Sequence, residues 1–348
     1  MLAIGGAAVV LLAILGVALP VFLHDRAKAD DETAVAPVAP SEPTLDREEY
    51  DRRLRQLAHV TDVGTVPEDG SEETRLWPVT AAYPEYGAIL PFKRIVAYYG
   101  NFLSRGMGVL GEYSEEVMLE KLGREVQAWE EADPTTPVQP AIDYIAVTAQ
   151  LSPGRDGKYR LRMPDEQLDK ALAIAEKIGG IVIFEVQPGL ANLMGEIRAL
   201  EPYLVKPQVH LAIDPEFVMI KTGARPGTRV GVVDATDVNA AAEYLAELVR
   251  ANDLPPKILI VHRYTRYMVT NATEIEPLPE VQIVMDMDGW GPPAQKYDSY
   301  NSYIYPEPVQ FTGFKLFYKN DIKRLGSRLL TPAEILELTP QPIFIQYQ

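Results

Sequence analysis

The chain has 348 residues, of which 47% are hydrophobic and 24% are charged, and it contains no cysteine. The absence of cysteine excludes disulfides, thiolate metal ligands and a cysteine nucleophile. The formal net charge of -16 argues against a nucleic-acid partner, because phosphate binding requires a basic face.

The N-terminal segment is uncharged over residues 2–23, which is long enough for a helix to span a bilayer. No basic residue precedes it, which favours a signal anchor over a cleaved signal peptide, but a small-x-small motif ends at Ala29. Two basic residues follow the span and favour a cytoplasmic domain, whereas the acidic, proline-rich residues 30–44 are typical of a surface stalk. We expect a single-pass membrane anchor over residues 1–23 with an extracytoplasmic domain, which is secreted if the chain is cleaved near Ala29.

Residues 24–76 are predicted to form a linker rich in proline and acidic residues. Apolar residues between positions 45 and 57 have close to helical spacing. This stretch is either a short helix that covers the bottom of the next domain or a part of the stalk. The compact domain is expected over residues 77–348.

Eight short apolar runs follow, and each ends in polar residues just before a loop. Amphipathic segments of helical period lie between most of them. This alternation predicts an α/β fold with a parallel sheet closed into a (β/α)8 TIM barrel. A doubly wound nucleotide-binding sheet is disfavoured, because GxxxxGK[ST] does not occur and the glycine string that begins at Gly106 has the wrong spacing after the first run. The runs are RIVAYYGN, AIDYIAVTAQ, GIVIFEVQPG, VHLAIDPEFV, KILIVHRY, VQIVMDMDGWG, FTGFKLFY and PIFIQYQ.

Three connecting segments carry specific expectations. The polar and aromatic residues 292–308 are predicted to be a poor helix. A helix is expected to begin after Thr331 as N-cap, with Pro332 at its first position. No helix follows the eighth run, so an element before the first run is expected to cover that gap.

Side chains alternate between the two faces of a strand, so parity assigns the polar residues to faces. The predicted inner faces gather polar groups at the strand ends, where barrel enzymes carry their chemistry. These faces hold Tyr144, Ala146, Thr148 and Gln150 in the second run; Ile183, Glu185 and Gln187 in the third; His210, Ala212 and Asp214 in the fourth; Ile260, His262 and Tyr264 in the fifth; Gln282, Val284, Asp286 and Asp288 in the sixth; Gly313 and Lys315 in the seventh; and Phe344, Gln346 and Gln348 in the eighth.

Carboxylates end three of the runs. Two carboxylates across a barrel mouth are what glycoside hydrolysis requires, one as an acid and one as a nucleophile or base. The candidate catalytic residues are Glu216 or Asp214 as general acid, Asp286 or Asp288 as its carboxylate partner, and Glu185 at the end of the third run. The alternative is that Asp214 and Asp286 cap loops or pair with Lys315 and His262 in a buried polar network.

Aromatic and polar residues gather at the same strand ends. Aromatic faces pack against the apolar faces of sugar rings, although tyrosines also pack loops with their hydroxyls exposed. We predict that His262, Lys315 and Tyr264 position the substrate. The complete set of predicted substrate-binding residues is Tyr98, Tyr99, Asn101, Gln187, His262, Tyr264, Trp290, Lys315 and Gln346.

The carboxylates of the fourth and sixth runs are also oxygen ligands suited to Ca²⁺ or Mg²⁺, and His210 or His262 could join them. No HExxH or GxSxG motif occurs, and only these two histidines fall in the predicted barrel. We therefore expect no metal, no other cofactor and no Ser-His-Asp triad.

Several strings resemble those of uncharacterised bacterial cell-surface proteins with a glycoside-hydrolase-like TIM barrel. They are YYGNFLSRGMGVLGEYS, VHLAIDPEFVM, LPPKILIVHRY, VMDMDGWG and TGFKLFY, and the resemblance covers about Phe92 to Gln348. It implies a barrel and a cell-envelope location. Many retaining glycosidases have carboxylates ending strands four and seven, whereas the seventh run here ends at Lys315 and its neighbours, and the DxxDxDxE run of chitinase-like barrels is absent.

The expected function is that of a membrane-tethered extracytoplasmic barrel, held by residues 2–23, that binds and hydrolyses a glycan or another envelope polymer. The alternative is a catalytically inactive barrel that serves as a binding or structural module of an envelope assembly with protein partners. A third hypothesis, a metal-dependent phosphodiester hydrolase, is disfavoured by the acidic charge and the lack of a basic cluster.

Overall fold

The computed structural model describes residues 44–60 and 76–348, which belong to one compact unit. The predicted membrane span over residues 2–23 and most of the predicted linker lie outside the described residues. No helix within the described ranges is both long and apolar enough to cross a bilayer.

Eight parallel strands close into a barrel, which confirms the predicted (β/α)8 fold. Most of them are buried along their whole length, as expected for parallel strands covered on both faces. The last barrel strand pairs with the first and closes the ring. In order around the barrel, the strands are β1 (Arg94–Gly100), β2 (Val138–Ala149), β4 (Ile181–Val186), β5 (Val209–Ile213), β7 (Lys257–Arg263), β9 (Val281–Met287), β10 (Phe311–Leu316) and β11 (Phe344–Tyr347).

Three short strands lie beside the ring. β3 (Arg160–Arg162) pairs antiparallel with β2, and β6 (Val233–Asp234) pairs with β8 (Val269–Thr270) in a separate two-stranded sheet.

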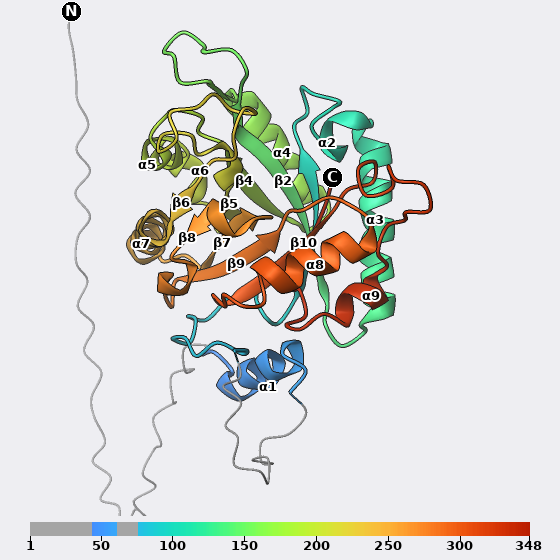
Figure 1. The fold of residues 1–348 in the computed structure, drawn as a ribbon. Helices are drawn as coiled ribbons and strands as arrows, with labels where there is room; N and C mark the ends of the chain where they lie inside the picture. Colours follow the sequence, from blue (N-terminus) through green and yellow to red (C-terminus); the bar gives the residue numbers. More distant parts are fainter. Residues whose placement is uncertain (1–43, 61–75) are drawn as a thin grey trace, which may run out of the picture. The chain divides into compact units, whose positions relative to one another are not determined.

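Helices surround the ring of strands (Figure 1). Met118, Leu122 and Trp129 of α3 are buried on one stripe, and burial of each such side chain stabilises the fold by about 1.5–3 kcal/mol. The helices after β1 are α2 (Val109–Glu112), α3 (Glu115–Ala132), α4 (Asp165–Lys177), α5 (Leu193–Arg198), α6 (Glu201–Leu204), α7 (Ala235–Asn252), α8 (Pro293–Tyr303) and α9 (Pro332–Leu336).

The prediction of a poor helix over residues 292–308 is wrong, because α8 forms there. Its residues lack a wide apolar stripe, but tertiary contacts stabilise it. Lys296 is buried and forms an ion pair with Asp321 at 3.1 Å, and one turn later the Tyr300 hydroxyl donates to Thr312 Oγ1 at 2.8 Å. Such contacts override a weak intrinsic propensity.

The predicted start of the last helix is confirmed. Thr331 is the N-cap of α9, Pro332 occupies its first position, and Thr331 and Glu334 form a reciprocal capping box.

Helix α1 (Arg47–Leu57) covers the amino-terminal end of the barrel, which confirms the first of the two alternatives for this stretch. The Asp46 side chain caps its first turn by accepting from the Glu49 backbone N at 2.9 Å. Tyr50 and Leu57 are buried among residues at the starts of the strands. An element that precedes β1 therefore seals the bottom of the barrel.

The barrel interior has two layers. The lower layer is apolar and is formed by Ile95, Ile183, Ala212, Ile260, Val284 and Phe344, together with α1. The upper layer, toward the carboxyl ends of the strands, holds buried polar groups, among them Glu185, His262, Asp286 and Lys315. The buried carboxylates and Lys315 thus gather at one end of the barrel, whereas His210 and Gln282, near the strand starts, bond to backbone atoms.

The inner face of β2 differs from the prediction. Tyr144, expected inside, lies in the outer core and stacks on Phe102 with ring centroids 4.7 Å apart. Asp143, expected outside, is fully buried and contacts residues of the upper layer. The pairing register of β2 with β4 shifts between Ile145 and Val147, and such a bulge reverses the parity of the residues on either side of it.

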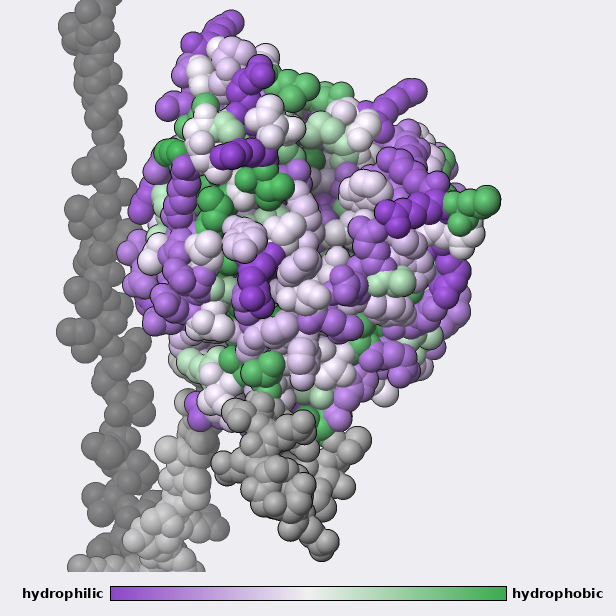
Figure 2. All heavy atoms as spheres, viewed as in Figure 1, coloured by the Kyte–Doolittle hydropathy of each residue, from purple (hydrophilic) through white to green (hydrophobic). Residues whose placement is uncertain are grey.

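Hydrophilic residues cover most of the face drawn in Figure 2, with hydrophobic side chains scattered between them. Scattered single apolar side chains are normal on a protein surface.

Candidate active site

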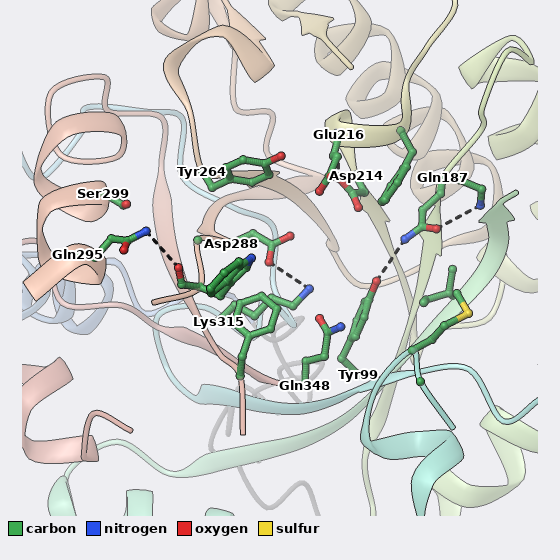
Figure 3. A pocket seen from close by; sticks show the side chains of 18 residues that line it. Tyr99, Gln187, Asp214, Glu216, Tyr264, Asp288, Gln295, Ser299, Lys315 and Gln348 are labelled. Atoms are coloured by element: carbon green, nitrogen blue, oxygen red, sulfur yellow. Dashed lines mark hydrogen bonds and ion pairs between the residues drawn. The ribbon is translucent and has the colours of Figure 1, made fainter. Parts of the chain in front are cut away.

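A cavity of about 550 Å³ opens at the carboxyl ends of the strands, where (β/α)8 enzymes form their active sites. Its volume is typical of small-molecule sites. Asp214, Glu216 and Asp288 line it, and Figure 3 shows their carboxylates directed into the same space. Three of the five predicted catalytic residues therefore meet at one cavity.

The turn after β5 carries two of these carboxylates. Asp214 Oδ1 accepts a hydrogen bond from the Glu216 backbone N at 2.9 Å, which starts a single 3-10 turn over Pro215–Phe217. Gly231 packs closely on this turn, since a Cβ there would lie 2.4 Å from the Pro215 carbonyl oxygen. This packing holds the two acidic side chains beside each other at the cavity.

Both carboxyls bind protons more tightly than usual. Burial, followed by the charge of Glu185, raises the pKa of Asp214 well above its usual range. Burial and the charge of Asp288 raise the pKa of Glu216, while the charge of Lys315 opposes them. A carboxyl that keeps its proton toward neutral pH suits the role of a general acid.

Asp288 has a different environment, because it is paired with a buried cation. Lys315 Nζ lies 3.2 Å from Asp288 Oδ1 and 3.8 Å from the ring centroid of Tyr99. Burial lowers the pKa of Lys315, but the charge of Asp288 and of neighbouring carboxylates raises it above its usual value. Lys315 therefore stays charged in the cavity wall and balances Asp288.

Glu185, Asp286 and His262 do not line the cavity and form a sealed cluster beside it. His262 Nε2 is 3.1 Å from Glu185 Oε2, and His262 Nδ1 is 3.0 Å from Asp286 Oδ2. Burial lowers the pKa of His262, but its contacts with Asp286 and Glu185 raise it well above its usual range. This part of the site is the buried polar network considered as the alternative in the sequence analysis.

Aromatic side chains and an amide complete the cavity wall. Tyr99, Tyr264 and Trp290, which were predicted to bind substrate, line the cavity. Trp290 is 48% exposed. Gln187 also lines it, and its Nε2 donates to the Tyr99 hydroxyl at 3.2 Å. Further aromatic lining comes from Phe217 and Phe317.

The structure places four predicted substrate-binding residues away from the cavity: His262, which belongs to the sealed cluster, and three others. Tyr98 lies on the outer face of β1, where its hydroxyl is 3.0 Å from that of Tyr318. Asn101 orders the loop after β1 by accepting from the Leu103 backbone N at 2.9 Å. Gln346 points inward but is fully buried, and its Nε2 donates to Asp143.

Asp143 is the buried acidic residue that the sequence analysis missed. Burial and the charge of Glu185 raise its pKa to about 8. Parity counted from the start of β2 would have placed it inside, because Ala141, two residues earlier, lies in the interior core. Parity counted from the polar end of the strand fails because the bulge intervenes.

No protein-family model matches the chain, and no curated protein does so. Among solved structures, two mannanases of Bacillus subtilis are similar at 12% identity each. The first alignment covers 74% of this chain and 81% of that mannanase with a TM-score of 0.35. The second covers 64% of this chain and 74% of that mannanase with a TM-score of 0.33. With both TM-scores below 0.5, the (β/α)8 fold follows from the strand pairing of this chain, and its chemistry follows from the cavity.

Proposed function

We propose that the cavity binds a glycan and hydrolyses a glycosidic bond, with Glu216 as general acid and Asp288 as its carboxylate partner. The observation that carries this proposal is the contrast between the two carboxyls. Glu216 has a raised pKa, whereas Asp288 forms an ion pair with Lys315. A carboxyl with a raised pKa and a second carboxylate paired with a cation, placed after different strands, match the two roles that glycoside hydrolysis needs.

In this mechanism Glu216 donates its proton to the leaving glycosidic oxygen. Asp288 stabilises the positive charge that develops on the sugar ring, either as a nucleophile or as the base that activates water. Asp214 holds the backbone of Glu216 and adds a second proton-binding carboxyl to the wall. Lys315 keeps Asp288 in place.

The aromatic wall supports a carbohydrate as the ligand. Tyr99, Tyr264 and Trp290 come from three different strand ends and offer ring faces or hydroxyls to the cavity. Sugar rings pack their C–H faces on such rings and hydrogen-bond through their hydroxyls. Gln187 adds an amide that can bond to hydroxyl groups.

The test is hydrolysis of a panel of neutral and amino-sugar polysaccharides by the wild-type protein and three variants. We expect Glu216→Gln and Asp288→Asn to lower kcat by roughly 10²–10⁴-fold. The matched control is Glu276→Gln, an exposed carboxylate outside the cavity, which should keep full activity. Full activity in Glu216→Gln and Asp288→Asn would exclude this mechanism.

A second candidate is a barrel that binds a glycan without cleaving it. It is favoured by the sealing of Glu185 and Asp286 against His262, which leaves fewer free carboxylates at the mouth. This candidate predicts saturable glycan binding by the wild-type protein with no release of reducing ends. Glu216→Gln would then change the affinity for the glycan, and neither protein would release reducing ends.

The location of the barrel is also part of the proposal. Residues 2–23 are uncharged, and an acidic proline-rich stretch follows. We infer a cell-envelope protein of a bacterium, anchored by this span, with the barrel outside the cytoplasm. Membrane fractionation and digestion of intact cells by added protease test it: a barrel that resists the protease until the cells are lysed would contradict the extracytoplasmic position.

A further inference from the structure

We propose that a divalent transition-metal ion binds beside the cavity, held by Asp143, Glu185 and His262. These residues come from three barrel strands and are fully buried. One potential ligand atom from each lies within 4.8 Å of those from the other two. The inference is independent of the glycan chemistry proposed above.

The free atoms of this trio point to a ligand. Within the described part of the chain, Asp143 Oδ1, Glu185 Oε2 and His262 Nε2 are buried without a hydrogen-bond partner. His262 Nε2 and Glu185 Oε2 are 3.1 Å apart, but their contact lacks hydrogen-bond geometry. Buried polar atoms without partners are costly, so three at one point are best explained by a bound cation.

The other polar atoms of the two carboxylates are anchored. Gln346 Nε2 donates to Asp143 Oδ2 at 2.5 Å, and Gln187 Nε2 donates to Glu185 Oε1 at 2.7 Å. Each side chain is thus oriented through one oxygen and leaves the other free. Gln346 Oε1 is also buried without a partner among the described residues and offers a further oxygen beside Asp143.

The histidine is oriented in the way that metal-binding histidines usually are. His262 Nδ1 lies 3.0 Å from Asp286 Oδ2. A proton on Nδ1 that is donated to Asp286 leaves Nε2 as the metal ligand, and carboxylate–histidine–metal arrangements of this kind fix the ring and strengthen the ligand. Asp286 is therefore a positioning residue for the site.

Charge balance favours a cation at this place. Asp143, Glu185 and Asp286 are three buried acids around His262. A buried charge without compensation is unfavourable. Lys315, a buried cation of the upper layer, forms its ion pair with Asp288 at 3.2 Å and not with these three acids. A divalent ion balances the acids without removing any of them.

The ligand chemistry selects the kind of ion. Carboxylate oxygens alone suit Mg²⁺ or Ca²⁺, whereas an imidazole nitrogen with carboxylates suits Zn²⁺ or Mn²⁺. We assign the site to an ion of the second kind. None of the three ligands lines the cavity, so the ion stabilises the upper layer of the barrel and does not contact the glycan.

The experiment uses the full chain, freed of metal with a chelator and titrated calorimetrically with Zn²⁺ or Mn²⁺ alone. We expect one ion per chain and a higher melting temperature on binding. Asp143→Asn and Glu185→Gln should weaken binding by more than about 100-fold, and Asp286→Asn by roughly 10–100-fold.

The matched control is Glu196→Gln, which removes a buried carboxylate of α5 that pairs with Arg160 and Arg162 and does not belong to the trio. It should change the affinity by less than about threefold. Absence of binding to the folded wild-type protein, or equal weakening by Glu196→Gln and Asp143→Asn, would overturn the site.

A measurement on the wild-type protein guards against variants that fail to fold. Pulsed electron paramagnetic resonance of the Mn²⁺ form should show coupling to one histidine nitrogen. The absence of nitrogen coupling would mean that His262 is not a ligand and that the ion sits on surface carboxylates. No glycan is present in these measurements, so their outcome is separate from that of the hydrolysis assays.

Discussion

Gly313 faces Asp286 across the pair of strands β10 and β9, and a Cβ on Gly313 would lie 2.4 Å from Asp286 Oδ1. The lack of a side chain on one strand thus makes room for the carboxylate of the next. Asp286 in turn contacts His262 at 3.0 Å. A residue without functional groups therefore sets the geometry of the buried network.

Gly313→Ala should destabilise the protein by about 1–3 kcal/mol, because the new methyl group forces Asp286 or Phe344 out of place. Denaturant unfolding measures this change. Gly123→Ala is the matched control: Gly123 is an exposed residue of α3 whose added Cβ would meet no atom within 4 Å. It should stabilise the helix by about 0.5–1 kcal/mol. Equal effects at the two positions would contradict the close packing at Gly313.

The protonation of Glu216 should respond in opposite directions to its two charged neighbours. Asp288 raises its pKa and Lys315 lowers it, so Asp288→Asn should lower the pKa and Lys315→Met should raise it further. A general acid loses activity as the pH rises through its pKa. The alkaline limb of kcat/KM should therefore move to lower pH in the first variant and to higher pH in the second. Carbon-13 NMR titration of the Glu216 carboxyl measures the same pKa changes without a substrate. An unchanged pKa in both variants would contradict this coupling.

Lys257 predicts a pH dependence of stability. Burial lowers its pKa from 10.5 to about 8 in the folded protein. Between these values the unfolded chain binds more protons, so stability rises with pH by up to about 1.4 kcal/mol per pH unit. Unfolding measured between pH 8 and 9.5 should show the wild-type protein gaining stability relative to Lys257→Met. Lys206 is exposed, so the free energy of unfolding of Lys206→Met should depend on pH as that of the wild type does. The same pH dependence in Lys257→Met would refute the lowered pKa of Lys257.

Tyr98 and Tyr99 form a natural pair of test positions. Tyr99→Phe removes a hydrogen bond of 2.9 Å to Glu185 Oε1 and a hydroxyl at the cavity, and Tyr98→Phe removes one contact to Tyr318. Each should lose about 0.5–1.5 kcal/mol of stability. Only Tyr99→Phe should weaken glycan binding, measured by calorimetry. An equal loss of affinity in Tyr98→Phe would mean that the cavity extends to the other face of β1.

The barrel and the carboxylates at its cavity could be predicted from alternation and strand order, because Asp214 and Asp288 come directly after regular strands. Asp143 was missed because parity was counted from the polar end of its strand, and the bulge after Ile145 reverses the parity between that end and Asp143. The sequence also does not show which of the adjacent Tyr98 and Tyr99 faces the barrel interior, and only the pairing of β1 with its neighbours assigns Tyr99 to the inside. The helix α8 was missed because Lys296 and Tyr300 are stabilised by distant residues rather than by their neighbours in the chain.

The two-layer interior has a consequence for how the ligand specificity of such a protein can evolve. Cohesion comes from the lower layer, where Ile95, Ile183 and Ile260 pack among other apolar residues, and recognition comes from the upper one. Substitutions near Glu216 or Trp290 can therefore change which ligand the cavity binds, while the apolar lower layer keeps the chain folded. The lower layer maintains the fold and the upper layer determines specificity, so ligand specificity can change without a change of fold.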